Sequence, residues 1–258
     1  MSARQGNAVQ SFSIGFEESS FDETKYSNQM SQILGNQHRL EMLSADRCLK
    51  LLDSIYLHLD EPLGDSSLVP SFMMCQIARE DVTVALGGDG SDELFAGYDP
   101  FRAIKPASLY SKLIPKFAHH MFSHVAGLVP VSHRNMSMDF KIKRFLSGMP
   151  YDACVRNPIW LGPLPPSCLS ELFGESININ EVYSEAIDAW YQPQSNGEVD
   201  RTLQFYTELY LQNDILTKMD RAGMLNSLEV RSPFLDIDFV DLVRQIPARF
   251  KFDGKQTK

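Results

Sequence analysis

Cysteine is scarce in this chain and scattered along it. The 258 residues include four cysteines, at positions 48, 75, 154 and 168, and no two of them have the CxxC spacing of a zinc or redox motif. Isolated thiols fit a reducing compartment. No run approaches the roughly 20 apolar residues of a membrane helix, and the first ten residues, MSARQGNAVQ, lack the apolar core of a signal peptide. The sequence therefore predicts a soluble, cytoplasmic protein.

Basic residues are also in deficit. Lys and Arg number 24 against 33 Asp and Glu, which gives a formal net charge of −9. That sign argues against a broad nucleic-acid-binding face. It does not exclude a single nucleotide, because backbone N–H groups, a few lysines and bridging Mg²⁺ can supply positive charge locally. The apolar fraction of 43% and the charged fraction of 22% are typical of a globular protein.

Short apolar runs alternate with helical periodicity in the first part of the chain. Residues 11–16 (SFSIGF) predict a strand, and the polar stretch after them predicts a helix that opens near Asp22. The elements expected next are a strand at 38–43, a helix at 46–60, a helix at 68–79 and a buried strand at 81–86. This alternation predicts a parallel sheet.

The later part of the chain is expected to be helical. Ten prolines between positions 100 and 193 interrupt any regular strand–helix repeat. We therefore predict an α/β part at 11–98, an inserted helical region at 99–198 and a helical C-terminal part at 199–258. In the last part we expect three helices. The first begins near Val199, the second spans 215–228 and the third spans 239–246.

The segment Gly87-Gly88-Asp89-Gly90-Ser91-Asp92-Glu93 directly follows the strand predicted at 81–86. Three glycines allow positive φ values and a close approach of the backbone to an anion, and the residues after them look ready to open a helix. The spacing is neither a Rossmann GxGxxG nor a Walker loop.

The acids of this segment change its interpretation. Asp89, Asp92 and Glu93 would repel a naked pyrophosphate, so a phosphate site here requires Mg²⁺ between carboxylates and phosphate oxygens, or an acid that handles a proton. An acidic helix N-cap without further function is the alternative. A calcium loop lacks the ligand ladder and closing Glu of an EF-hand.

Two further segments combine charges with turns or apolar residues. Residues 60–67 (DEPLGDSS) hold three carboxylates in one loop, and both simple chain punctuation and a ligand loop remain open there. Residues 218–236 mix charged with apolar residues in a way suited to a buried ionic network. For these residues a structural role is favoured over a direct role in catalysis.

Taken together, five ordered segments resemble the synthetase domain of the asparagine synthetase family, which includes β-lactam synthetases. VALGGDGSDELFAGY resembles the second pyrophosphate-binding segment of that family, and SFSIGFEESSFDE its strand-to-helix segment beside the adenine. LDEPLGDSSLVPSF resembles the substrate-side loop, DILTKMDRAGMLNSLEVRSPFLD the helical signature, and FKFDGKQTK the lysine segment. The resemblance covers almost all of residues 1–258.

This resemblance implies a fold and a reaction. The fold would be α/β, a doubly wound parallel sheet of the ATP-pyrophosphatase type with a mainly helical inserted and C-terminal region. The reaction would be ATP- and Mg²⁺-dependent adenylation of a carboxylate, aspartate in the first instance, followed by attack of ammonia derived from glutamine. Alternatives are a nucleotide-binding or partner-binding fragment without catalysis, and a relative that acts on another carboxylate. A homo-oligomer is left open.

The resemblance also assigns residues. Asp89 takes the position of the family's active-site acid, which is often Glu, and Lys258 that of the lysine that neutralises phosphate charge. The nucleotide and pyrophosphate group comprises Ile14, Gly87, Gly88, Gly90, Ser91 and Asp92, with Asp92 facing pyrophosphate through Mg²⁺. The substrate-side loop would contribute Glu61, Asp65 and Ser66. A structural role falls to Lys218, Asp220, Arg221, Glu229 and Arg231.

Two segments of the family pattern are not found in the sequence. The first phosphate loop, Ser-Gly-Gly-x-Asp-Ser, normally precedes the SFSIGF strand and does not occur in residues 1–10. The glutaminase domain, whose nucleophile is a cysteine directly after the initiator Met, is also not present, and residue 2 is Ser. We therefore expect a fragment of a longer protein, with weak stability and little or no adenylation by itself.

Overall fold

The computed structural model describes residues 9–192 and 197–254, and it shows a mixed α/β protein that is mostly helical. Two compact units divide the chain. Unit 1 contains residues 1–87 and 214–231, and unit 2 contains residues 88–213 and 232–258. Each unit has its own core of buried side chains.

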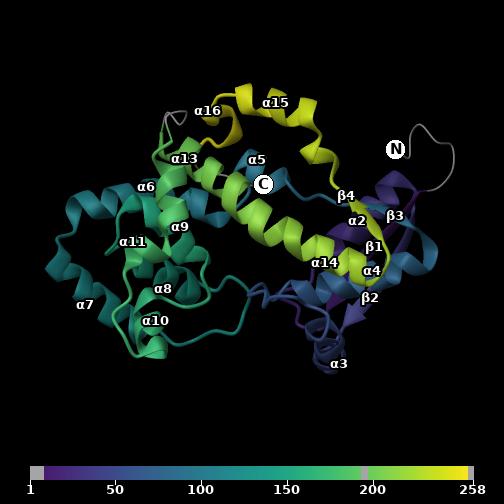
Figure 1. The fold of residues 1–258 in the computed structure, drawn as a ribbon, viewed down its shortest axis with the longest axis horizontal. Coiled ribbons are helices and arrows are strands. Elements are labelled where there is room, and N and C mark those ends of the chain that lie inside the picture. Colours follow the sequence, from purple (N-terminus) through teal and green to yellow (C-terminus); the bar gives the residue numbers. More distant parts are fainter. Residues whose placement is uncertain (1–8, 193–196, 255–258) are drawn as a thin grey trace. The chain divides into compact units, whose positions relative to one another are not determined.

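Unit 1 carries all the strands of the described residues (Figure 1). Its elements are β1 (Gln10–Phe16), α2 (Thr24–Leu34), β2 (Gln37–Leu43), α3 (Ala45–Tyr56), α4 (Leu68–Asp81), β3 (Val84–Leu86), α14 (Thr217–Leu225) and β4 (Glu229–Arg231). β1 pairs with β2 in parallel, from Gln10 opposite Gln37 to Phe16 opposite Leu43, and β3 pairs in parallel with β4. The predicted parallel pairing is confirmed.

Helix α4 organises the core of unit 1. Its buried residues include Leu68, Phe72, Met73 and Ile77, so it is apolar on more than one face, as a central helix must be. Met73 and Ile77 pack against β1, while Phe72 belongs to a second cluster that also contains side chains of α14, β3 and β4. The two small sheets therefore share one helical layer.

The single doubly wound sheet that we predicted is not seen in the described residues, where the strands form two separate two-stranded sheets. The strand expected at 81–86 is also shorter and less buried than predicted, because α4 continues to Asp81. Val84 and Leu86 are 41% and 51% exposed, while Ala85 between them packs on the core. One face of β3 is thus uncovered.

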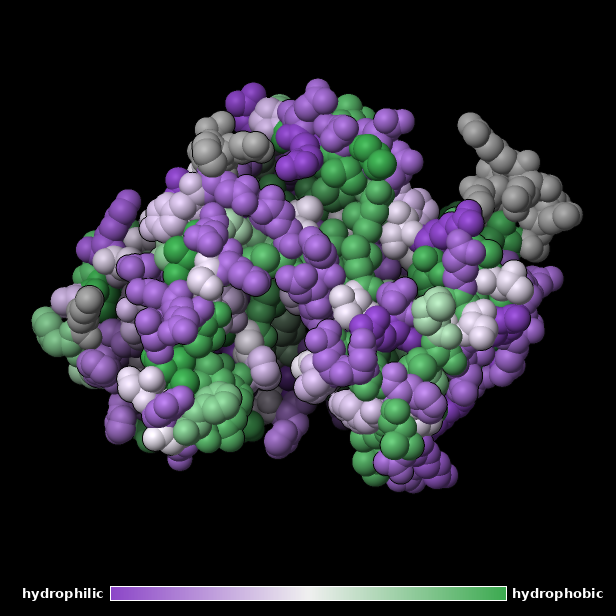
Figure 2. All heavy atoms as spheres, in the orientation of Figure 1, coloured by the Kyte–Doolittle hydropathy of each residue, from purple (hydrophilic) through white to green (hydrophobic). Residues whose placement is uncertain are grey.

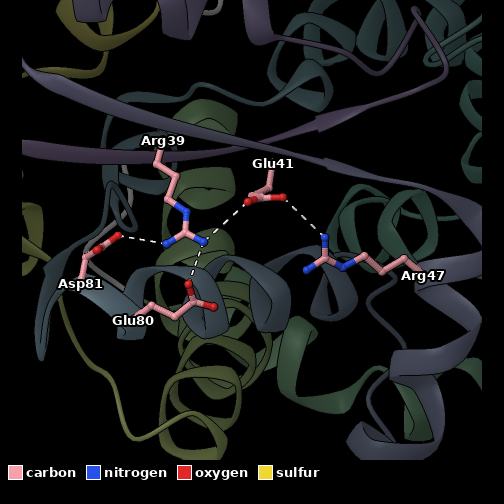
Figure 3. A network of polar contacts seen from close by, with 5 residues as sticks. All are labelled: Arg39, Glu41, Arg47, Glu80 and Asp81. Carbon is pink, nitrogen blue, oxygen red and sulfur yellow. Dashed lines mark hydrogen bonds and ion pairs between the residues drawn. The ribbon is translucent and has the colours of Figure 1, made fainter.

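Ion pairs surround the charged strand β2 (Figure 3). Arg39 contacts Glu41, Glu80 and Asp81, at 3.6, 2.7 and 3.1 Å, and Glu41 also contacts Arg47 at 3.6 Å. Charged side chains on a strand discourage further pairing with another strand. β2 therefore has the composition of a natural outer strand.

Unit 2 is helical in its described residues (Figure 1). Its helices are α5 (Ser91–Phe95), α6 (Asp99–Leu113), α7 (Lys116–Gly127), α8 (Met138–Gly148), α9 (Ala153–Leu161), α10 (Pro166–Phe173), α11 (Ile179–Val182), α12 (Ser184–Trp190), α13 (Glu198–Phe205), the 3₁₀ turn η2 (Pro233–Leu235), α15 (Ile237–Gln245) and α16 (Ala248–Lys251). Aromatic rings fill its main core, where Tyr98 stacks on Tyr206 with ring centroids 4.8 Å apart.

The helix expected from about Val199 continues further than its apolar pattern indicated. A π-helix, η1 (Tyr206–Leu216), joins α13 to α14 with no non-helical residue between them. The chain passes from unit 2 to unit 1 within η1. A π-helix of this length is unusual.

Apolar side chains also reach the surface of unit 2 (Figure 2). On α7, the side chains of Phe117, Met121 and Val125 recur every four residues and are 81%, 60% and 58% exposed.

None of the helices in the described residues has both the length and the apolar character needed to cross a membrane.

Candidate functional site

The glycine-rich loop begins where β3 ends. Gly87 belongs to unit 1, and its N–H donates to the carbonyl of Arg231 at 2.8 Å, which extends the pairing of β3 with β4 by one residue. The loop therefore leaves the carboxyl end of a parallel strand, where α/β proteins commonly bind ligands.

The remainder of the loop, from Gly88, belongs to unit 2 and opens helix α5, as predicted. Gly90 is the N-cap of α5 and has a φ of +92°, a conformation that L side chains rarely adopt. A Cβ at this position would also overlap the side chain of Leu235. Helix α5 has five residues, so its dipole contributes less to anion binding than the sequence led us to expect.

The two acids predicted to carry chemistry lie on this loop and on the first turn of α5. Asp89 is half-buried, and one of its carboxylate oxygens accepts a hydrogen bond from Ser232 Oγ at 3.3 Å. The side chain of Asp92 lies against Gly97, leaving no room for a Cβ there. Both carboxylates are thus held by close neighbours within unit 2.

Glu93, which the sequence analysis counted among the acids of this segment without giving it a site role, is buried in unit 2. It is 2% exposed, and its carboxylate accepts a short hydrogen bond from the hydroxyl of Tyr98. Burial and the neighbouring Glu93 raise the pKa of Tyr98 far above its ordinary range, so the phenol stays protonated and can donate. The tyrosine five residues after the acid was the available sequence signal.

A cavity of about 440 Å³ lies beside Glu93 in unit 2. Its charged lining residues are Glu93, Asp200, Glu208, Arg244 and Lys251. Burial lowers the pKa of Lys251, and the repulsion of Arg244 lowers it further, although Asp200 opposes this. The cavity therefore presents both signs of charge.

In unit 1, the structure brings two of the predicted residues together. Lys218 Nζ lies 2.7 Å from Asp65 Oδ2 and 2.7 Å from Ser67 Oγ, and the Lys218 side chain is 8% exposed. Burial alone raises the pKa of Asp65, but the bonds from Lys218 and Ser67 outweigh it and hold the pKa below its usual value. Glu61 and Ser66, the other two predicted residues of this loop, are exposed.

The predicted ionic network around residues 218–236 is buried only at Lys218. Arg221 pairs with Asp60 at 2.9 Å and with Asp220 at 3.4 Å, and the Asp60 and Asp220 side chains are 71% and 62% exposed. Glu229 and Arg231 pair with each other at 2.7 Å on the surface of β4. The charged side chains of these pairs face water, whereas Lys218, Ala222 and Val230 of α14 and β4 are turned towards the core of unit 1.

The structure places the side chain of Ile14 in the core of unit 1. It is partly buried and packs against the cluster of Leu43, Met73 and Ile77, so any contact of Ile14 with a nucleotide would come from its backbone. Lys258, assigned as the lysine that neutralises phosphate charge, lies outside the described residues.

The donor groups fit a magnesium ion that is held jointly with phosphate. In the described ranges, no three His, Cys, Asp or Glu side chains lie close enough to bind a metal ion by themselves. Mg²⁺ in nucleotide enzymes is commonly held by one or two carboxylates, substrate phosphates and water. Asp92, on the first turn of α5, can serve as such a carboxylate.

Comparisons with known proteins agree with these features. The sequence profile of the family described as asparagine synthase matches residues 1–258. The asparagine synthetase [glutamine-hydrolyzing] 1 of Bacillus subtilis is 29% identical over 261 residues, which cover 97% of this chain and 38% of that protein. A relative in Mycobacterium bovis, also named for glutamine-hydrolysing asparagine synthetase, is 30% identical over 260 residues, with 100% and 38% covered.

The fungal amidase chry2 of Gibberella zeae is 22% identical over 272 residues, which cover 95% of this chain and 38% of the amidase. The chain thus spans under two fifths of the length of these curated relatives. Because the family profile matches from the first residue to the last, the chain belongs to the asparagine synthase family.

Proposed function

We propose that this chain is the carboxylate-activating part of an ATP-dependent ligase that forms an amide. The observation that carries the proposal is the match to the asparagine synthase family over residues 1–258. It is supported by a glycine-rich, acidic loop at the carboxyl end of β3, a position suited to a nucleotide.

The residues of this chain would divide the work as follows. Backbone groups of Ile14, Gly87 and Gly88 would line the AMP part of ATP, and Gly90 and Ser91 would approach pyrophosphate. Asp92 would help to hold Mg²⁺, which would supply positive charge to the phosphates. In this assignment, residues 11–98 form the nucleotide-binding part and the helical regions at 99–198 and 199–258 complete the domain.

Asp89 and Lys258 would act on the reacting groups. Adenylation joins a substrate carboxylate oxygen to the α-phosphorus of ATP and releases pyrophosphate; attack of ammonia on the acyl carbon then releases AMP. Lys258 would neutralise the negative charge that develops on the phosphate oxygens. Asp89 would act in the acyl-adenylate step, where it can accept a proton from the attacking nitrogen.

The acceptor carboxylate is proposed to be aspartate, and the ammonia to come from a glutaminase domain in a longer protein. The names of the two bacterial relatives support both assignments. The fungal relative named an amidase favours a second candidate, in which the same activation is applied to a different carboxylate.

We also propose that the two small sheets belong to one doubly wound sheet. β2 carries the ion pairs of Arg39 and Glu41, and β4 carries the Glu229–Arg231 pair, so both have the charged composition of outer strands. β1 and β3 contain no charged residue, and β3 exposes Val84 and Leu86. A further strand supplied by a longer protein would fit between β1 and β3.

This arrangement can be tested by hydrogen exchange. In a protein extended upstream of residue 1, we expect the amides of residues 10–16 and 84–86 to exchange at least about tenfold more slowly than in the 258-residue chain, because both strands gain hydrogen-bonded neighbours. The amides of α15 provide an internal control that should not change. Equal exchange of β1 and β3 in the two proteins would refute a strand between them.

The ligase function is tested by carboxylate-dependent exchange of labelled pyrophosphate into ATP in the extended protein. We expect exchange with aspartate, and amide formation when ammonia or glutamine is added. Exchange with another acid but not with aspartate would select the second candidate. No exchange with any of a panel of amino-acid and other carboxylates would refute the ligase and leave a nucleotide-binding or partner-binding role.

A further inference from the structure

Among the lysines and arginines of the described residues, Lys218 is the one that is buried. The residue as a whole is 6% exposed. A buried ammonium is costly unless it is paired and hydrogen-bonded. The position of Lys218 in the core of unit 1 therefore depends on the groups that surround its Nζ atom.

Those groups form a closed cluster of Lys218, Asp65 and Ser67, which we call the Lys218 cluster. Lys218 Nζ donates to Asp65 Oδ2 and to Ser67 Oγ, both at 2.7 Å. Ser67 Oγ in turn donates to Asp65 Oδ2 at 2.8 Å, and the Ser67 N–H donates to Asp65 Oδ1 at 2.8 Å. Each side chain of the cluster is bonded to the other two, so its geometry is strongly fixed.

The Lys218 cluster joins two segments that lie far apart in the sequence. Lys218 is on α14, 153 residues from Asp65, which lies in the loop between α3 and α4. Ser67 precedes α4 at its N-cap position, but its side chain makes no capping bond to that helix. Its hydroxyl is engaged with Lys218 and Asp65 instead of serving the local helix.

We propose that Lys218 is a positioning residue for the carboxylate substrate of the proposed ligase, acting through the loop at residues 60–67. Asp65 is then not a substrate contact, as the family resemblance implied, but the anchor by which the loop is held. Glu61 and Ser66, which are exposed on the same loop, remain as the side chains available to the substrate. This inference rests on the proposed function.

The charges around the Lys218 cluster make the ammonium difficult to replace. Asp214, one helical turn before Lys218, is half-buried, and both burial and the proximity of Asp65 raise its pKa, while Lys218 opposes this. Without Lys218, the repulsion between Asp65 and Asp214 would no longer be offset by a buried cation. The loop would then move Asp65 away towards water.

The first test follows the loop itself by hydrogen–deuterium exchange in the extended protein. In Lys218→Met, we expect peptides covering residues 60–67 to exchange at least about tenfold faster than in the unmodified protein. Asp60→Asn is the matched control, because it breaks the exposed pair with Arg221 on the same loop and should change this exchange by less than about twofold. Unchanged exchange in Lys218→Met would overturn the anchor.

The second test separates positioning from general stability. The double variant Lys218→Met/Asp65→Asn removes both charges of the ion pair and so leaves no unpaired carboxylate at position 65, where the introduced asparagine can still bond Ser67. In pyrophosphate exchange we expect its KM for the accepted carboxylate to rise about tenfold or more, with its KM for ATP within about twofold. A wild-type KM for the carboxylate, or an equal rise in both KM values, would overturn the positioning role.

The two proposals can fail separately. If the unmodified extended protein exchanges pyrophosphate and the double variant has normal kinetics, the ligase stands and the role of Lys218 falls. If the unmodified protein shows no exchange with any acid, the ligase falls and takes the substrate role of Lys218 with it, whatever the loop exchange shows.

Discussion

Replacing Asp89 with asparagine is expected to reduce ammonia-dependent amide formation by at least about 100-fold in the extended protein. The expectation follows from the size of general acid–base contributions, about 10²- to 10⁴-fold. Asparagine has almost the same shape but cannot take a proton. Its amide oxygen can still accept the hydrogen bond from Ser232 Oγ, so the loop should keep its conformation.

Two variants show whether the carboxylate itself matters. Asp89→Glu restores an acid with a longer reach, which is the residue often found at this position in the resembled family, and we expect it to retain measurable amide formation. Ser232→Ala removes only the hydrogen-bond donor and should cost less than about tenfold. Full activity in Asp89→Asn, with an unchanged unfolding transition, would remove Asp89 from the mechanism.

The part of the fold that could be predicted from sequence was the part that depends on local pattern. The strand at residues 10–16, the helices α3 and α4 and the glycine loop opening α5 all follow from apolar periodicity and turn residues. The strand that contains β3 was predicted to be longer and more buried than it is, because valines such as Val82 and Val84 are typical of strands that are covered on both faces. Composition cannot reveal that one face of β3 has no cover in this chain.

The candidate site was predictable where its residues are neighbours in the sequence. Asp89 and Asp92 could be assigned from a single loop, and Asp65 and Lys218 from separate segments, but no pattern links two residues that are 153 positions apart. Only the structure shows that Asp65 is bonded to Lys218. The burial of Glu93 could not be predicted, because a buried carboxylate and an N-terminal helix acid look alike in sequence.

Gly90→Ala is expected to destabilise unit 2 by about 2–5 kcal/mol. About 1–2 kcal/mol comes from an L side chain in the left-handed region, where Gly90 has a φ of +92°. About 1–3 kcal/mol comes from overpacking, because the new Cβ would overlap the side chain of Leu235. Urea titrations measure the sum as the loss in the free energy of unfolding. The rate of pyrophosphate exchange should also fall, because Gly90 lies next to Asp89.

The two contributions can be separated with variants that share only one of them. Gly174, also in unit 2, has a left-handed φ of +68°, but a Cβ there would meet nothing within 4 Å, so Gly174→Ala should cost only the conformational part. In the double variant Gly90→Ala/Leu235→Ala, the overlap is relieved, and the alanine at position 90 should cost about as much as the alanine at position 174. If Gly90→Ala were no more costly than Gly174→Ala, the packing of Leu235 against the loop would play no part in fixing it. If it is more costly and the double variant recovers the difference, the conformation of the acidic loop is set jointly by its own backbone and by the turn at residues 233–235, which would explain why glycine is needed immediately after Asp89.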